Sequence, residues 1–122
     1  MALKHAAAGT VVYAGALGPR LSEEKTATLV NEPGLQIFRL VLTAGQSLAE
    51  HRVPAGLVIQ CLEGVIAFQA CGRELRMHPG DLCHVPPQEP HAVHAFTAAS
   101  ALVTLYGPAG GTSPNNSQES SS

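Results

Sequence analysis

The sequence lacks tryptophan and has few aromatic residues and little charge. Aromatic residues make up 4% of the 122 residues, and Lys, Arg, Asp and Glu together make up 13%. The seven Lys and Arg residues are spread along the chain, whereas nucleic-acid binding normally needs a clustered basic surface. No segment approaches the roughly 20 consecutive apolar residues of a membrane-spanning helix. We therefore expect neither a nucleic acid nor a membrane as a partner.

Cysteine is also scarce, with three residues at Cys61, Cys71 and Cys83. An odd number of cysteines argues against a disulfide framework. The N-terminal segment, residues 1–9, is rich in alanine but lacks the long apolar core of a secretory signal. These features together predict a cytoplasmic protein.

Hydrophobic residues, in contrast, make up 45% of the chain. A small domain with so few charged residues cannot cover its whole surface with polar groups, and it tends to bury the remaining apolar surface against a partner. We therefore expect a homodimer, formed through a β-face or by strand exchange near the N-terminus.

Glycine, proline and asparagine divide the chain into short β-prone segments. Asn31–Gly34 has Pro and Gly at the two central positions of a type II turn. Glu63-Gly64 and Cys71-Gly72 are two-residue hairpin signals, and a last hairpin is expected around Thr97–Ser100. The expected strands are Thr26–Val30, Leu35–Thr43, Leu57–Leu62, Val65–Ala70, Arg73–Met77, Leu82–Val85, Ala92–Phe96 and Ala101–Tyr106.

Two segments do not fit this β-pattern. A short helical turn is expected near Leu21–Lys25, with Ser22 as its N-cap. Gly110–Ser122 contains no aliphatic or aromatic residue, which predicts a disordered tail. Short strands at this spacing predict one all-β barrel or sandwich domain over residues 1–109.

Two stretches, at about residues 45–64 and 80–95, resemble the two sequence motifs of the cupin family. The similarity extends over 35–106 and implies a single-domain double-stranded β-helix, the RmlC-like jelly-roll barrel. The residues that keep the motif spacing are Gly45, His51 and Gly64 in the first stretch and Gly80, Pro86 and His91 in the second.

The resemblance also implies a divalent transition metal, usually iron, manganese, zinc or nickel, bound by three histidines and one carboxylate. Of these four ligands the sequence keeps only His51 and His91, because Val53 replaces the second histidine and Leu57 replaces the glutamate. Catalytic metal sites generally have at least three protein ligands. A bound metal and no metal are both compatible with this set.

Among the remaining donors, His84 is the best candidate for a third ligand of such a metal. A bulge next to Pro86 would re-aim its side chain into the barrel. Strand alternation places Val93 and Ala95 on the inward side together with His91, and places His94 on the outside. Further motif positions are also changed, with Gln88 in place of a glycine and Ala95 in place of an asparagine.

Three functions are compatible with this sequence, and whether the protein is an enzyme stays open. The first is a binding protein for a small organic ligand, with His51 and His91 as polar anchors in the barrel. The second is a metal-dependent enzyme of the dioxygenase or isomerase type that uses the same two histidines. The third is a degenerate barrel that acts as a structural or regulatory dimer. The predicted apolar wall of the ligand site consists of Val53, Leu57, Ile59 and Met77.

Overall fold

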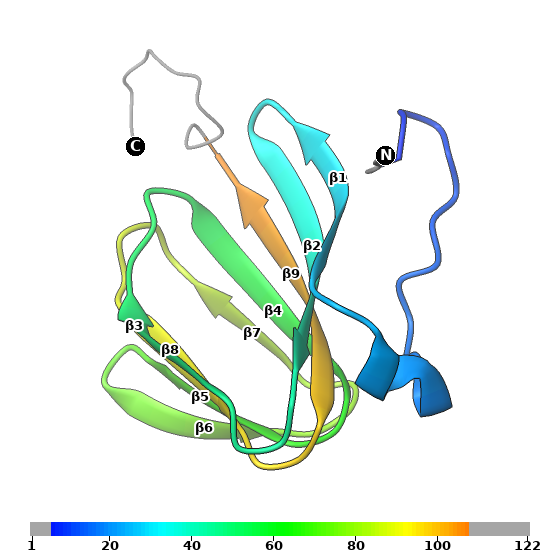
Figure 1. Cartoon of the computed structure of the whole chain (residues 1–122). Coiled ribbons are helices and arrows are strands. Elements are labelled where there is room, and N and C mark those ends of the chain that lie inside the picture. The colour runs from blue at the N-terminus through cyan, green and yellow to red at the C-terminus, as the bar shows by residue number, and fades with distance from the viewer. Residues whose placement is uncertain (1–5, 108–122) are drawn as a thin grey trace.

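Two antiparallel sheets face each other in the computed structural model, which describes residues 6–107 (Figure 1). The five-stranded sheet has the order β1-β2-β9-β4-β7, and the four-stranded sheet has the order β3-β8-β5-β6. The fold is therefore all-β and of the jelly-roll type, as the sequence predicts. The elements are the 3₁₀ helix η1 (Gly18–Glu23) and the strands β1 (Ala27–Glu32), β2 (Leu35–Leu42), β3 (Ser47–His51), β4 (Gly56–Glu63), β5 (Ile66–Ala70), β6 (Arg73–Met77), β7 (Leu82–Val85), β8 (His91–Ala95) and β9 (Ala99–Tyr106).

Side chains that alternate along the strands fill the space between the sheets. In β4, Leu57, Ile59 and Cys61 are buried, with exposed fractions of 6%, 1% and 0%. Ile66 and Phe68 of β5 meet them from the other sheet as members of the same hydrophobic cluster. Each such side chain contributes roughly 1.5–3 kcal/mol when it is fully buried. The inward direction predicted for β4 is therefore confirmed.

Most strand boundaries predicted from the sequence agree with the structure. Arg73–Met77 and Leu82–Val85 are reproduced to the residue, and the other predicted strands differ by at most two residues at either end. The turn at Cys71-Gly72 joins β5 and β6, with φ values of 54° and 73°. Gly34 has a φ of 79°, as a type II turn requires at this position. Strand β3 was not delimited from the sequence.

Two predicted hairpins are wrong. Glu63-Gly64 connects β4 to β5, and Ala95 is followed by a segment that leads from β8 to β9, but each connection passes from one sheet to the other. The physical reason is the jelly-roll topology, in which the pairing partners of β9 are β2 and β4. Local turn residues report a change of direction, not the sheet that the next strand joins.

The predicted helical turn is also misplaced. The 3₁₀ helix begins at Gly18, and Leu17 precedes it without a side-chain capping bond. Pro19 presets the φ angle of the first turn, so that Ser22 lies inside the helix instead of capping it. In residues 6–107 no helix is long and apolar enough to cross a membrane. The predicted C-terminal tail lies outside the described residues.

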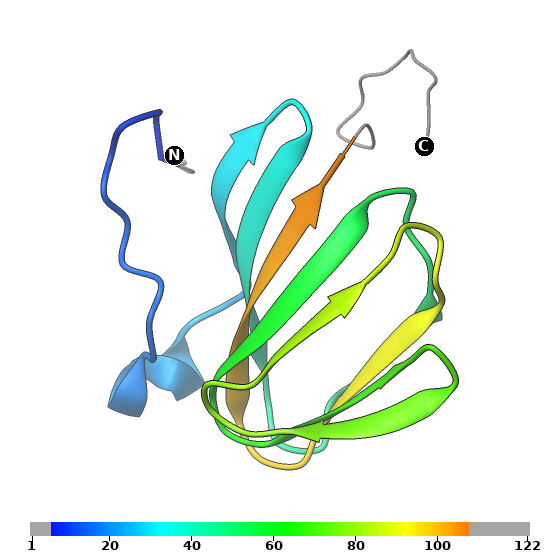
Figure 2. The ribbon, with the colours of Figure 1, turned by 180° about the vertical axis from the view of Figure 1, so that it is seen from behind.

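The segment that precedes η1 is held against the outer side of the five-stranded sheet by two charged side chains (Figure 2). The carboxylate of Glu63 accepts hydrogen bonds from the N–H groups of Leu17 and Gly18, at 2.9 and 3.0 Å, and from the Ser100 hydroxyl at 2.6 Å. The Nη2 of Arg39 donates to the carbonyl oxygen of Tyr13 at 2.9 Å. Both charged side chains thus bind backbone groups of the segment.

These bonds lower the pKa of Glu63. Burial alone raises the pKa, but the hydrogen bonds from Leu17, Ser100 and Gly18 and the charge of Arg39 outweigh burial and hold it below the usual value of 4.5. The ionised carboxylate is therefore the form that the folded protein stabilises.

We predict that Gly64→Ala destabilises the fold more than Gly72→Ala. The two glycines have nearly the same φ, 79° and 73°, so a side chain costs about 1–2 kcal/mol at either position for the left-handed conformation alone. At Gly64 a Cβ would also overlap the carbonyl oxygen of Ala98, whereas nothing lies within 4 Å at Gly72. Urea unfolding measures both variants, and equal losses of stability would contradict the packing argument.

We further predict that Glu63→Gln lowers the free energy of unfolding by about 1–2 kcal/mol at neutral pH, because hydrogen bonds to a charged acceptor are lost. A lowered folded-state pKa gives stability that is present above pH 4.5 and is lost as the pH falls through the folded-state pKa. The difference between wild type and variant must therefore shrink in acid. Urea unfolding over this pH range, with the exposed Glu32→Gln as control, tests whether the stability difference shrinks as the pH falls. A difference that grows on acidification would refute it.

Candidate ligand-binding site

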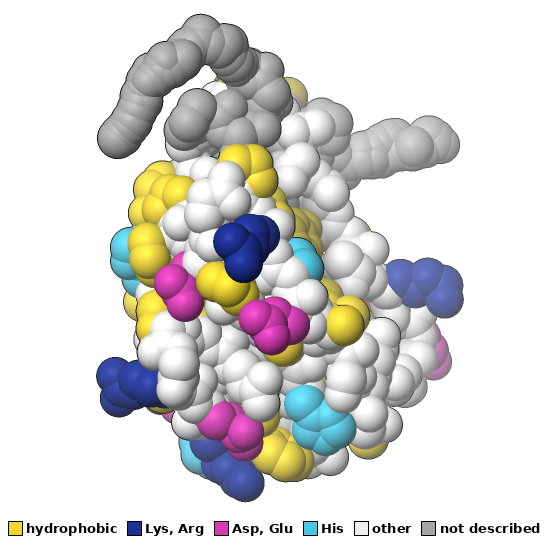
Figure 3. Space-filling model, turned by 90° about the vertical axis from the view of Figure 1, so that its left-hand side faces the viewer, with side chains coloured by type: hydrophobic (Ala, Val, Ile, Leu, Met, Phe, Trp, Pro, Cys, Tyr) yellow, Lys and Arg dark blue, Asp and Glu magenta, His cyan; other side chains and the backbone are white. Residues whose placement is uncertain are grey.

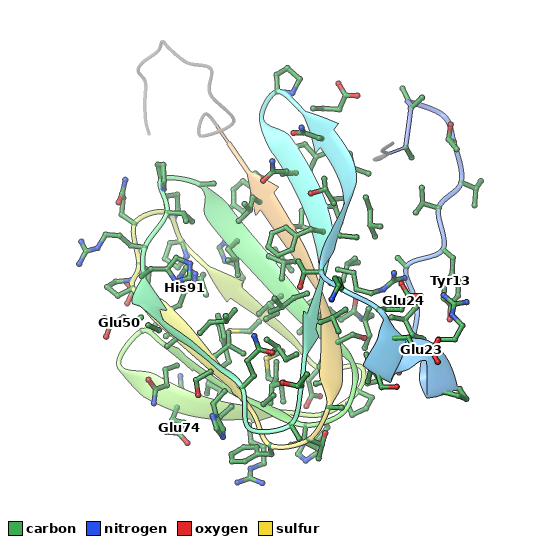
Figure 4. All side chains as sticks on the ribbon, viewed as in Figure 1. Tyr13, Glu23, Glu24, Glu50, Glu74 and His91 are labelled. Atoms are coloured by element: carbon green, nitrogen blue, oxygen red, sulfur yellow. The ribbon has the colours of Figure 1, made fainter. Side chains whose placement is uncertain are left out.

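The two histidines predicted as anchors lie directly opposite each other on neighbouring strands. His51 of β3 pairs with His91 of β8 in the strand register. Their ring centroids are 4.5 Å apart, and the ring planes are inclined by 60°. His91 is buried, with 4% of its surface exposed, whereas His51 lies at the rim and is exposed. Figure 4 shows His91 between the two sheets.

Backbone carbonyl groups fix the proton position on both rings. His51 Nδ1 lies 3.1 Å from the carbonyl oxygen of Ala49, and His91 Nδ1 lies 3.0 Å from that of Glu89. A carbonyl oxygen can only accept a hydrogen bond, so each Nδ1 carries a proton. In the neutral ring, Nε2 is then the nitrogen with a free lone pair. The Nε2 atoms of His51 and His91 are therefore two hydrogen-bond acceptors at one end of the barrel.

The predicted apolar wall belongs mostly to the core. Leu57, Ile59 and Met77 are buried members of the hydrophobic cluster, and Val53 is half-buried. The carbonyl oxygen of Val53 accepts a hydrogen bond from the N–H of Gln88 at 2.8 Å. Two of the four positions at which the sequence departs from the cupin motifs, Val53 and Gln88, thus join the loops that precede β4 and β8.

The structure does not bring His84 to this pair. His84 lies on the outer side of β7, and its Nε2 is 2.6 Å from the hydroxyl of Tyr106. The ladder between β4 and β7 is continuous from Leu57 to Gln60, so the expected bulge is absent there. Burial raises the pKa of the Cys61 and Cys83 thiols, which disfavours the thiolate form that binds metals.

The donor set does not fit the metal centre implied by the family motifs. In the described part of the chain, no group of three or more His, Cys, Asp or Glu side chains is arranged to hold a metal ion. The two imidazoles have no carboxylate and no third histidine to complete a site. This pair therefore suits hydrogen bonding to a ligand better than metal coordination.

A second polar pair lies on the outer side of the same strands and was not predicted from the sequence. Ser47 of β3 pairs with His94 of β8, and Ser47 Oγ is 2.6 Å from His94 Nδ1. The outward direction of His94 was predicted correctly, as was the inward direction of Val93 and Ala95, which are buried. The partner of His94 follows only from the β3–β8 register, which no local sequence signal gives.

A family model described as a cupin domain matches residues 38–105. This range covers more than half of the chain, and the protein belongs to the cupin family. Among the curated proteins, none matches the sequence.

Solved structures agree with this fold. A conserved protein of unknown function from Streptococcus pyogenes is 23% identical, with a TM-score of 0.67, and the match covers 88% of this chain and 98% of that one. A cupin superfamily protein from Desulfitobacterium hafniense is 17% identical with a TM-score of 0.67, over 87% and 98% of the two chains. A variant of salicylate 1,2-dioxygenase from Pseudoaminobacter salicylatoxidans, in complex with gentisate, is 25% identical with a TM-score of 0.61; the match covers 66% of this chain and 24% of the enzyme.

Proposed function

We propose that this cupin binds a small organic ligand at the end of the barrel where His51 and His91 meet. The observation that carries the proposal is the direct contact of the two rings, each with its Nδ1 bonded to a backbone carbonyl group. The free Nε2 atoms suit a ligand that donates hydrogen bonds, such as a hydroxylated ring. Val53, Leu57, Ile59 and Met77 form the apolar wall of this proposed site. A cytoplasmic location remains a prediction.

The apolar replacements favour a binding function over metal chemistry. Val53 and Leu57 stand where the family motifs have a histidine and a glutamate, and neither side chain can donate an electron pair to a metal. Ligand sites in proteins are mostly apolar, with a few polar groups that orient the ligand. A pair of imidazoles beside an apolar wall matches this description.

Gentisate is a suitable first probe, because one structural neighbour is complexed with it and because it carries two hydroxyl groups. We predict that gentisate shifts the ring ¹⁵N resonances of His51 and His91, whereas benzoate, which lacks hydroxyl donors, does not. His51→Ala should weaken binding by about tenfold, the value of one hydrogen bond of about 1.4 kcal/mol. The control is His78→Ala, at an exposed histidine. Equal shifts by the two acids, or no shift at either ring, would count against the proposal.

A metal assay distinguishes the proposed binding protein from the alternative function, which is a dioxygenase- or isomerase-type enzyme. Protein purified without a chelator is analysed for iron, manganese, zinc and nickel, before and after His51→Ala. A stoichiometric metal that the substitution removes would favour the enzyme over the binding protein. Little metal, together with no ligand at the two rings, would favour a degenerate barrel with a structural or regulatory role.

We also propose that the protein forms a homodimer through its N-terminal segment. Val11 and Tyr13 expose 95% and 66% of their surface there. Strand β1 is an edge strand of its sheet, in which the carbonyl group of Leu29 accepts a hydrogen bond from the N–H of Ala6 at 2.7 Å. Val11→Asp should shift the molecular mass from two chains toward one in light scattering, because a charge would be buried at the contact. Ala44→Asp, at an exposed loop position, is the matched control. A wild-type mass of one chain would rule out the dimer.

A further inference from the structure

Two adjoining hollows lie over the four-stranded sheet, and the lining of the first includes His91. Their volumes are about 470 Å³ and about 420 Å³. They share Gln69, Glu74 and Ala92 in their linings, so they form one continuous groove. The combined size falls within the range of about 300–1,000 Å³ that is usual for small-molecule sites. Figure 3 shows the side of the molecule on which these strands lie.

The floor of the groove is made of small residues because of the strand register. Ala67 of β5 lies between Arg76 of β6 and His94 of β8, and its side chain points outward, opposite to Phe68. Ala92 and Ala49 line the same hollow. These methyl groups leave room above the sheet and give the groove a flat apolar base.

Polar side chains surround this base, and most are held in place by a partner. Gln69 Nε2 donates to Glu74 Oε1 at 3.2 Å, which leaves the amide oxygen and the second carboxylate oxygen for a ligand. Ser47 Oγ and His94 Nδ1 are 2.6 Å apart at the other side. Glu50 lines the first hollow, and Figure 4 shows Glu50 and Glu74 on the outside of the barrel.

An aromatic wall closes one end of the groove. The Phe96 ring lies edge-on to His94, with the centroids 5.3 Å apart, and the guanidinium group of Arg76 stacks 4.3 Å from the Phe96 centroid. Both contacts hold the Phe96 ring in place, because the interaction of a cation with the face of an aromatic ring is attractive. Phe96 therefore adds a rigid apolar surface beside the alanine floor.

Charged side chains of both signs line the groove. This mixture favours an uncharged ligand. Glu50, Glu74 and Glu89 oppose an anion, and Arg73 at the same end offsets part of their attraction for a cation. Figure 3 shows acidic, basic and apolar side chains intermixed on this side, with no large surface of a single charge. A neutral molecule with hydroxyl groups meets no charge repulsion in this groove. Each of its hydroxyl groups can donate a hydrogen bond to a carboxylate or amide oxygen and accept one from an N–H group.

We propose that this groove binds a neutral saccharide. A sugar ring has an apolar C–H face that fits the alanine floor, and its rim of hydroxyl groups fits the polar border formed by Gln69, Glu74 and the Ser47–His94 pair. The site differs from the one proposed inside the barrel, because Ala92 and His94 point outward from the strand whose His91 points inward. His91 also lines the first hollow, so the two sites adjoin there, but the alanine floor and the polar border of the saccharide site include neither histidine anchor.

The test is an NMR titration of the full chain with cellobiose, maltose and lactose, with glucosamine and glucuronate as charged probes. We expect the neutral disaccharides to shift the backbone amides of Ala49, Ala67 and Ala92 with millimolar affinity, and the charged sugars to bind more weakly. Ala92→Leu fills the floor and should abolish these shifts. Ala27→Leu makes the same change at an exposed position of β1, in the other sheet, and should leave them unchanged. Glu74→Ala should weaken binding about tenfold, as the loss of a hydrogen bond to a charged acceptor predicts.

Urea unfolding of both leucine variants confirms that they are folded before they are compared. The proposal is overturned when none of the three disaccharides shifts these amides at tens of millimolar. It is equally overturned when Ala92→Leu and Ala27→Leu bind alike, or when a charged sugar binds more tightly than the neutral ones.

Discussion

The pairing register of β3 and β8 determines both proposed sites of this protein. Because His51 lies opposite His91, the two rings meet between the sheets. Before a register shift between Leu48 and His51, the same two strands set Ser47 opposite His94 on the outer side. A shift of one residue would exchange the two sides of the strand, since side chains alternate with a period of two. The hydrophobic cluster holds the register, because Val93 would otherwise leave the core.

The histidine pair is an altered version of the cupin motifs. Val53 and Leu57 stand at the positions of the missing ligands, and the Nδ1 atoms of the two remaining imidazoles are bonded to backbone groups. Such rings can accept hydrogen bonds from a ligand, but they cannot by themselves complete a metal coordination sphere. What the altered motifs retain is the placement of two histidine side chains by two strands.

Local sequence signals predict the strands well and the connections poorly. Alternation fixes the inward side of β4 and β8, because each strand buries one face. Glu63-Gly64 suggests a hairpin, since a glycine with positive φ suits a tight turn. The same backbone angle also allows a passage between sheets, with Ala98 packed closely above it. The histidine pair can be anticipated because motif spacing identifies its members. The Ser47–His94 pair cannot, because it depends on long-range register.

The burial of the His91 ring supports the proposal that a ligand binds beside it. The residue is only 4% exposed, its Nδ1 is bonded to the carbonyl group of Glu89, and in the described residues no protein donor bonds to its Nε2. Nε2 of His91 is not among the buried atoms without a hydrogen-bond partner in the described residues, so the atom stays accessible to a ligand. A hydrogen bond made to it in partly apolar surroundings is stronger than in water. Phe68 lies beside this ring, with the two centroids 6.0 Å apart, and Val53 and Leu57 stand where the family motifs have a histidine and a glutamate. The altered motif therefore disfavours a metal, and it agrees with the small organic ligand that we propose for this ring.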